Sequence, residues 1–185
     1  MTYCEAVAAM EPGNVHRVYH DTAYGFPLEE DNELFGRLLL EINQAGLSWT
    51  TILNKEKNFR KAYGGFRVRT VASYGAAERR RLLNDAGIVR NRLKVDAAIH
   101  NAGVILGLQK EHGSFRAWLD AHHPLPLPAW VDLFRKTFRF TGGEIVHEFL
   151  MSTGYLPGAH TRSCPVYRKV LRMKPAWGRT AGGRV

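Results

Sequence analysis

Four side chains of the types that bind zinc stand near the two ends of the 185-residue chain. They are Cys4, His20, His160 and Cys164. Thiolate and imidazole groups are the usual zinc ligands, and four of them make a closed structural site. His160 and Cys164 are four residues apart, so one short turn can aim both at one ion. Such a site would clip together two chain ends whose hydrophobic pattern is poor.

Spacing alone leaves other interpretations of these residues open. A single H-x3-C pair is a weak signal in a chain with eight histidines, so ordinary polar positions explain it as well. His16 is a second candidate for the fourth ligand in place of His20. The adjacent His122 and His123 lack helical i, i+4 spacing, and we interpret them as surface polar residues.

A second group of residues surrounds Glu41, which interrupts the apolar face of a predicted helix. A carboxylate near a core is costly unless it is paired or used. Tyr19, Tyr24 and Trp49 offer flat walls around it, and aromatic faces with one carboxylate suit a flat cation. The alternative is that Glu41 is a solvated edge residue and that the aromatic rings are plain core.

A third signal is a tight turn centred on Gly87, between one predicted helix and a second that begins with basic residues. Backbone N–H groups from Gly87 to Val89, with the N-terminus of the next helix, form an anion site. Arg90, Arg92 and Lys94 add positive charge, as needed to hold DNA phosphates without reading base sequence. An ordinary helix-turn-helix corner with solvated arginines is the alternative.

Composition limits the classes of protein that fit. A length of 185 residues with 45% hydrophobic content suits one globular domain. No apolar run resembles a signal peptide or spans a bilayer, and two cysteines do not make a disulfide framework. We therefore expect a cytoplasmic protein that is not bound to a membrane.

The formal net charge of +9 favours a polyanionic partner, but much of the excess lies at one end. From Pro165 onward there are six basic residues and no acid. They are Arg168, Lys169, Arg172, Lys174, Arg179 and Arg184. We interpret this segment as a disordered basic tail, with a nucleic-acid-binding arm as the alternative. The charge permits a nucleic-acid partner without proving one.

The elements that must position these residues are helices almost throughout. Asp31 and Ser48 are predicted N-caps of two of them. The remaining predicted helices span residues 68–74, 76–84, 91–110, 114–121, 128–138 and 144–153. Strand-like alternation is scarce, so the expected class is all-α. Stretches of about 30 residues at each end lack a regular pattern and need something to order them.

Several motifs together resemble the bacterial DNA-3-methyladenine glycosylase I family. The first is Tyr19-His20-Asp21 followed by Gly25, and the second is Leu40-Glu41 with the run Gln-Ala-Gly-Leu-Ser-Trp at 44–49. The turn Asp85-Ala86-Gly87-Ile88 through Lys94 and the segments 138–142 and 154–164 also match. The likeness covers about residues 3–167, and the run at 44–49 is very specific.

This resemblance implies a helix-hairpin-helix DNA glycosylase fold in one domain, residues 1–167, followed by a basic tail, residues 168–185. It implies a structural Zn²⁺ clip that joins the N- and C-terminal segments, the Gly87–Val89 turn as the DNA anchor, and a base pocket. The zinc ligands would be Cys4, His20, His160 and Cys164. The pocket would be built by Glu41, Tyr19, Tyr24 and Trp49.

The implied reaction is hydrolysis of the N-glycosidic bond of N3-methyladenine in alkylated double-stranded DNA, the first step of base-excision repair. Tyr24 and Trp49 would stack on the flipped base. Glu41 would accept a hydrogen bond from the base edge and favour its cationic form. Leu47 would wedge into the gap left in the duplex. We expect the enzyme to act as a monomer.

Two absences predict a monofunctional enzyme that leaves the DNA strand intact. Many related glycosylases carry a Gly-Pro-Asp segment whose aspartate assists cleavage, and those that also cut the strand place a lysine just after the hairpin. This chain has no Gly-Pro-Asp, and Asn91 stands at the lysine position. The family usually shows Glu-Trp-Gly where this chain has Ala23-Tyr24-Gly25, and His16 stands where an aromatic residue is often found.

Other functions compatible with the same residues are a non-catalytic helix-hairpin-helix DNA-binding protein, a zinc-stabilised protein-interaction domain, and a glycosylase specialised for another alkylated base. The first two would leave Glu41 and its aromatic neighbours without a role. Release of free 3-methyladenine from alkylated DNA separates the enzyme from both of them.

Overall fold

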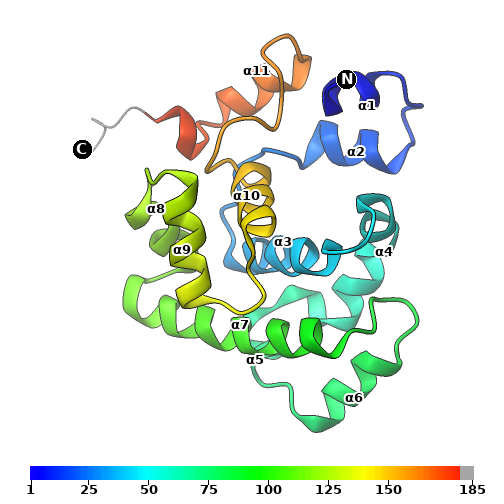
Figure 1. Cartoon of the computed structure of the whole chain (residues 1–185), viewed down its shortest axis with the longest axis vertical. Helices are drawn as coiled ribbons and strands as arrows, with labels where there is room; N and C mark the ends of the chain where they lie inside the picture. The colour runs from blue at the N-terminus through cyan, green and yellow to red at the C-terminus, as the bar shows by residue number, and fades with distance from the viewer. Residues whose placement is uncertain (180–185) are drawn as a thin grey trace.

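The computed structural model describes residues 1–179, and all regular secondary structure in that range is helical (Figure 1). The α-helices are α1 (Tyr3–Ala8), α2 (Val15–Thr22), α3 (Asp31–Gln44), α4 (Trp49–Ala62), α5 (Val68–Ala72), α6 (Ala76–Asn84), α7 (Arg92–His112), α8 (Phe115–His122), α9 (Leu127–Thr137), α10 (Gly143–Ser152) and α11 (Pro165–Arg172). Two short 3-10 helices are η1 (Gly64–Phe66) and η2 (Ala176–Gly178). Among these elements, none combines the length and the apolar character that crossing a membrane requires.

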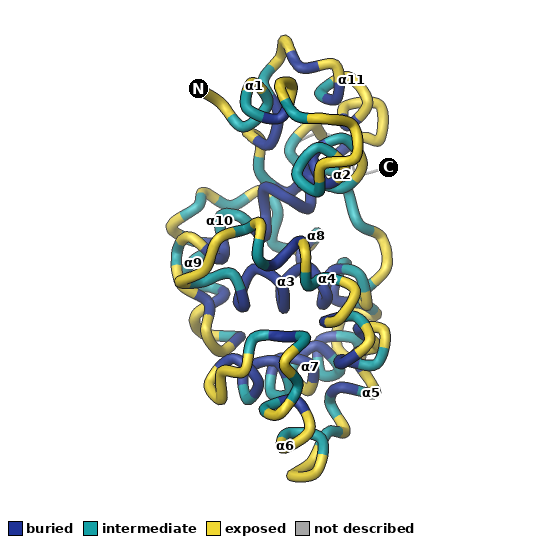
Figure 2. Tube along the Cα trace, turned by 90° about the vertical axis from the view of Figure 1, so that its right-hand side faces the viewer, coloured by how far each residue is buried: buried dark blue, intermediate teal, exposed yellow. Residues whose placement is uncertain are grey.

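Helix α3 is the central element, and every residue from Leu34 to Asn43 in it is buried (Figure 2). Its periodic apolar residues predict one buried face. The structure buries the other face as well, because α4, α7, α8 and α10 all pack against this helix. Polar residues of α3 therefore lie inside the protein and need internal partners.

The start of α3 differs in detail from the prediction that Asp31 is its N-cap. Glu30 occupies the cap position, and Asp31 is the first helical residue. The Asp31 carboxylate instead accepts hydrogen bonds from the backbone N–H groups of Phe115 and Arg116, at 2.8 and 3.0 Å. It thus satisfies the free donors at the N-terminus of α8 and ties that helix to the central one.

The middle helices agree closely with the pattern-based expectation. Helix α6 has the predicted bounds, and α4 begins after Ser48, whose hydroxyl accepts a hydrogen bond from Thr51 N–H at 3.2 Å. Helix α7 extends two residues beyond the predicted end, and α9 and α10 are each displaced by one residue. Such shifts are the usual uncertainty of helix ends.

The N-terminal segment differs more, because it is helical where we expected irregular structure. Thr2 and Glu5 form a reciprocal capping box at the start of α1, and the Asn14 side chain caps α2. These local caps stabilise two helices that are only six and eight residues long.

The C-terminal segment also differs from the expected tail at 168–185. Helix α11 continues to Arg172, and Val166 and Val170 in it are buried against Tyr167 and Trp177. Residues 168–179 are therefore part of the fold, and the remainder of the predicted tail, 180–185, lies outside the described residues. Helices α1 and α11 lie at the same end of the molecule (Figure 1).

Candidate functional site

A cavity of about 670 Å³ opens between α2, α3, α4 and α10. This volume is within the range of about 300–1,000 Å³ that holds small ligands. Its lining combines aromatic rings with carboxyl groups. The lining residues are Tyr3, His16, Tyr19, Tyr24, Glu41, Gln44, Ala45, Gly46, Trp49, Glu144, Ile145 and Glu148. The residues predicted to form a pocket are thus brought together, and the protein's own side chains do not fill the space between them.

Glu41 projects from the buried central helix into this cavity, and only 4% of its surface is exposed. The Ser152 hydroxyl donates to its Oε1 atom across 3.5 Å, which is a long hydrogen bond. Burial raises the pKa of the Glu41 carboxyl to about 8, Arg37 opposes this rise, and Glu148 adds to it. The interpretation of Glu41 as a solvated edge residue is therefore wrong, because α10 covers that side of the helix.

Arg37 lies one turn before Glu41 and is also buried. Its guanidinium donates to the Tyr19 hydroxyl at 3.1 Å and to the Ser152 carbonyl at 3.2 Å. It also lies 5.1 Å from the centre of the Tyr19 ring. This cation holds the Tyr19 wall in place and favours the ionised form of Glu41.

The aromatic walls meet one another edge to face or at a tilt. The ring of Tyr19 lies 5.3 Å from that of Trp49 and 5.5 Å from that of Tyr24. Tyr3 meets Tyr24 at 5.5 Å with perpendicular planes. These contacts join α1, α2, α4 and the segment after α2, and they hold the rings in place around the cavity.

The loop between α3 and α4 forms the rim of the cavity and presents Leu47 to solvent. Gly46 has φ +80°, a conformation that residues with a Cβ rarely adopt, and Leu47 is 39% exposed. Gln44 holds the turn at both ends: its carbonyl accepts from Leu47 N–H at 2.7 Å, and its side-chain amide donates to the Leu47 carbonyl at 2.9 Å. An exposed apolar side chain is thus fixed on a tight turn beside the pocket.

Lys94 occupies a different place from the one predicted. Its side chain is buried, and its ammonium group donates to the carbonyls of Asn43 and Ala45 at 2.9 and 2.6 Å. These carbonyls belong to the C-terminal end of α3, where a cation is favourable. The expectation that Lys94 contacts a phosphate is wrong, because its charge holds the rim loop instead.

The turn around Gly87 lies between α6 and α7 and does not line the cavity. The Asp85 carboxylate accepts from Gly87 N–H at 2.8 Å, and the Gly87 carbonyl accepts from Lys55 and Asn58 of α4, each at 3.3 Å. Helix α4 begins with Trp49, so one helix connects the turn with the pocket wall.

The side chains of Arg90 and Arg92 beside this turn are exposed, and Val89 is half-buried. Asn91 is the N-cap of α7, and its side chain accepts from Lys94 N–H at 3.2 Å. A basic surface therefore surrounds the turn, as expected for Arg90 and Arg92, although Lys94 is not part of it.

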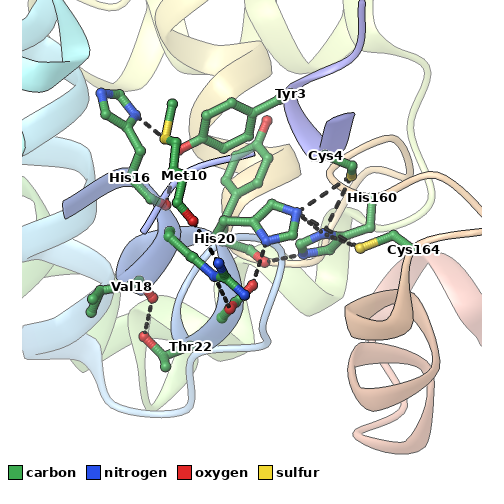
Figure 3. A network of polar contacts seen from close by, with 12 residues as sticks. Tyr3, Cys4, Met10, His16, Val18, His20, Thr22, His160 and Cys164 are labelled. Carbon is green, nitrogen blue, oxygen red and sulfur yellow. Dashed lines mark hydrogen bonds and ion pairs between the residues drawn. The ribbon is translucent and has the colours of Figure 1, made fainter. Parts of the chain in front are cut away.

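Cys4, His20, His160 and Cys164 converge where α1 and α2 meet the segment before α11 (Figure 3). Their ligand atoms all lie within 4.8 Å of one another. The sulfur-to-nitrogen distances are 3.4 to 3.9 Å, and His20 Nε2 lies 3.1 Å from His160 Nδ1. Zinc bond lengths in a tetrahedron give ligand-to-ligand distances of about 3.3–3.8 Å, so this group can hold a metal ion.

The second ring nitrogen of each histidine in this cluster has a partner that sets its orientation. His20 Nδ1 lies 2.7 Å from the Asp21 carboxylate, and His160 Nε2 lies 2.7 Å from the Tyr24 carbonyl. With protons on these two nitrogens, the other two are free to accept a metal. His16 is not part of the cluster: its ring contacts the Tyr3 hydroxyl at 3.1 Å and Thr50 Oγ1 at 2.8 Å.

Sequence reasoning missed several polar residues of the cavity, because they come from elements without a chemical motif. Arg37 and Ser152 flank Glu41 from α3 and α10, and Glu148 lies on the cavity side of α10. Phe140, just before α10, has φ +60° and is 38% exposed. The charged residues Arg37 and Glu148 within apolar helix patterns were the available signal.

Comparisons with known proteins agree with this geometry. The family described as Methyladenine glycosylase matches residues 9–126. The DNA-3-methyladenine glycosylase 1 of Escherichia coli (strain K12) is 31% identical over 168 residues, covering 80% of this chain and 89% of the relative. The DNA-3-methyladenine glycosylase of Haemophilus influenzae is 30% identical over 166 residues, with the same coverage.

Solved structures give a matching result. The 3-methyladenine DNA glycosylase I of Staphylococcus aureus, solved to explain 3-methyladenine recognition, superposes with a TM-score of 0.78 at 29% identity. The superposition covers 89% of this chain and 97% of that one. Sequence and backbone geometry thus point to the same set of proteins.

Proposed function

The chain belongs to the methyladenine glycosylase family, and we propose that it hydrolyses the N-glycosidic bond of N3-methyladenine in alkylated DNA. The observation that carries this proposal is Glu41, a buried carboxylate at the end of an aromatic-walled cavity of about 670 Å³. A carboxylate in such a place is costly for folding, and a cationic ligand offsets that cost.

The substrate's own chemistry explains why this pocket suffices. Alkylation at N3 makes adenine a cation, and the base leaves as a neutral molecule, so the bond is weak before the enzyme acts. The tasks left to the protein are to select the cation and to admit water to the sugar. We assign the selection to Glu41, which accepts a hydrogen bond from the base edge, and to stacking on Tyr24 and Trp49, worth about 1–3 kcal/mol per base.

Arg37 supports this role of Glu41 although it is itself positive. Its hydrogen bonds to Tyr19 and Ser152 hold it beneath the pocket, beside Glu41. From there it favours the ionised carboxylate. A neutral purine gains less from a carboxylate and from aromatic faces than a cationic one does.

A base inside a duplex is out of reach, so the nucleotide must leave the stack to enter the cavity. We assign the filling of the resulting gap to Leu47, which the rim loop presents to solvent. Exposed apolar side chains on tight turns serve this purpose in proteins that deform DNA.

The α6–α7 turn is the proposed DNA anchor, in the manner of a helix-hairpin-helix motif. The Gly87 N–H already bonds Asp85, so the N–H groups of Val89 and Arg90 are the next donors for a phosphate. Arg90 and Arg92 add exposed charge next to them. Asn91 caps α7 and carries no amine, which supports base removal without strand cleavage.

We further propose that the Cys/His cluster holds a structural Zn²⁺. The mixed thiolate and imidazole donors and the partners of both histidines suit this ion. The site joins α1 and α2 to the segment before α11, so it stabilises the part of the fold that carries Tyr19 and Tyr24. All four ligands are protein side chains, which leaves no position for substrate.

The decisive test is release of free base from DNA treated with a methylating agent. We expect the wild-type enzyme to release 3-methyladenine and to leave the strand uncut, and we expect Glu41→Gln to bind the same DNA but to release little base. DNA binding without any base release by the wild-type chain would instead favour the non-catalytic DNA-binding function. The two outcomes are separated by chromatography of the released bases and a gel assay for strand breaks.

A further inference from the structure

Glu148 is a second carboxyl group in the base pocket, carried by α10. It is half-buried, and burial is the main cause that raises the pKa of its carboxyl. Other half-buried carboxylates have strong donors within the fold, as Glu33 has in Arg60 at 2.8 Å and Asp31 has in the N-terminus of α8. Glu148 forms no ion pair among the described residues 1–179. Within that range its carboxylate accepts a hydrogen bond from a hydroxyl group, so no salt bridge neutralises its charge.

That hydroxyl belongs to Tyr24, the residue that replaces the tryptophan usual for the resembled family. The Tyr24 O–H donates to Glu148 Oε2 at 3.4 Å. This long bond aligns the carboxyl group along the pocket wall and leaves most of its lone pairs free for a ligand. A tryptophan at position 24 would have no such hydroxyl, so the two residues act as a pair.

The charged neighbours of Glu148 are of both signs. Glu148 raises the pKa of the Glu41 carboxyl, so an ionised Glu148 disfavours the ionised form of Glu41. Glu144 precedes Glu148 by one turn and is exposed, while His147 is the basic neighbour on the same helix and lowers the pKa of Glu148. The titratable and charged groups that face this region from the packed elements are Tyr3, His16, Tyr19, Tyr24, Arg37, Glu41, Glu144 and His147.

We propose that Glu148, aligned by Tyr24, is a base-binding and specificity-determining residue that contacts the cationic alkylated purine from the α10 side while Glu41 contacts it from α3. This inference rests on the proposed function and deepens it. Two carboxylates around one cavity repel each other when it is empty, and a bound cation relieves that repulsion. A neutral base does not, so the pair increases the preference for the cation.

The role of Glu148 in the reaction follows from the charge of the base. The base is positive before the bond breaks and neutral afterwards. Glu148 therefore contributes chiefly to binding the substrate, and its loss raises KM more than it lowers kcat. The N3-alkyl cation keeps its charge over the working pH range, so the pH dependence of kcat/KM reports the protein groups of the free enzyme.

The test compares wild type, Glu148→Gln and the control Glu111→Gln, which removes the same charge from an exposed glutamate on α7 that does not line the cavity. The assay measures kcat and KM for release of 3-methyladenine from methylated DNA between pH 6 and pH 9, conditions chosen to span the Glu41 pKa of about 8. For Glu148→Gln we expect KM at the alkaline end to rise roughly tenfold with kcat nearly unchanged, as loss of one charge-assisted contact predicts. The acid limb of kcat/KM should also move to lower pH, because the Glu41 pKa falls without its neighbour.

Glu111→Gln should leave KM and the acid limb close to the wild-type values. The inference is overturned if Glu148→Gln behaves like this control, or if both variants change KM equally. A loss of thermal stability in Glu148→Gln that lowers kcat without moving the acid limb also overturns it, since that is the mark of a structural role. A wild-type chain that releases no 3-methyladenine refutes the proposed function itself and the inference with it.

Discussion

Tyr19 and His20 are neighbours on α2, yet they belong to two polar regions of opposite character. His20 enters the Cys/His cluster, where each histidine nitrogen has either a ligand partner or a hydrogen-bond acceptor inside the protein. Tyr19 lines the cavity around Glu41, whose carboxylate has one long hydrogen bond from Ser152 and a raised pKa. The cluster is complete within the fold, whereas the pocket is complete only when a ligand enters.

The two regions separate polar groups that serve stability from polar groups that serve function. Buried polar groups whose hydrogen-bond partners are all present stabilise a fold. Buried polar groups that lack partners cost folding free energy and are typical of functional sites. The two regions also depend on each other. The backbone carbonyl of Tyr24 orients the His160 ring, and the side chain of Tyr24 is a wall of the pocket. Substitutions in each region therefore have different expected effects.

Breaking the cluster should have the largest effect, and the effect should be on stability. Cys164→Ser removes one soft ligand, and we expect it to abolish metal binding and to lower the free energy of unfolding by several kcal/mol, on the order of 4. Denaturant unfolding and elemental analysis of the purified protein measure both. Ser163→Ala is the matched control on the same turn. Unchanged stability and metal content in Cys164→Ser would falsify the metal clip.

Chelation tests the stabilising role of the cluster without a substitution. A strong chelator should lower the melting temperature of the wild-type protein and leave that of Cys164→Ser unaffected. Base release should fall in parallel, since the pocket walls Tyr19 and Tyr24 lie between cluster residues along the chain.

Breaking the pocket should have the next largest effect, and it should fall on catalysis. For Glu41→Gln we expect kcat/KM for 3-methyladenine release to drop roughly 100-fold or more, because an ionised group at the reacting base is lost. Affinity for DNA, measured by fluorescence anisotropy, should change little. A parallel loss of DNA affinity would show that Glu41 serves the fold or the DNA surface and not the base.

The same substitution should also change how the free energy of unfolding depends on pH, because the buried Glu41 carboxyl destabilises the fold when it ionises. The folded pKa of Glu41, about 8, lies above its unfolded value of 4.5. The neutral carboxyl therefore stabilises the fold fully below about pH 4.5, and this contribution is lost as pH rises through 8. We expect Glu41→Gln to gain about 1–3 kcal/mol relative to wild type between pH 5 and pH 8. Urea unfolding at both pH values measures this, and a constant difference would contradict the raised pKa.

A substitution in the rim loop between α3 and α4 should have the smallest of these effects. Leu47→Ala should lower kcat/KM on duplex DNA roughly tenfold, because the flipped state loses its apolar wedge. Excision from single-stranded DNA should change much less, since no stack has to be opened. Leu171→Ala, an equally exposed leucine on α11, is the control and should match wild type.

Local patterns predict the helices of the middle of the chain, because α4 and α6 have their apolar periods within their own segments. The four residues of the Cys/His cluster follow from the resemblance to a family, because their spacing alone leaves His16 as an alternative. Helices α1 and α2 were not predicted, although their cap residues Thr2, Glu5 and Asn14 stand in the sequence. Helix α11 escaped prediction because its basic residues hide two buried valines.

The surroundings of Lys94 and Glu41 could not be predicted in the same way. Lys94 stands in a basic segment that is typical of DNA contacts, but the carbonyls at the end of α3 bind its ammonium group. Nothing local to Lys94 indicates that α3 ends there. Its burial depends on residues about 50 positions away.

Residue type and short-range spacing predict the all-helical class and the presence of aromatic residues with one unexplained carboxylate, whereas the set of four Cys/His residues follows from the resemblance of several motifs to a known family. Only the tertiary structure decided that Glu41 is buried, that Arg37, Ser152 and Glu148 surround it, and that Lys94 serves the rim. The physical reason is that burial and electrostatics depend on which helices pack together, and α3 and α10 meet across more than 100 residues of chain.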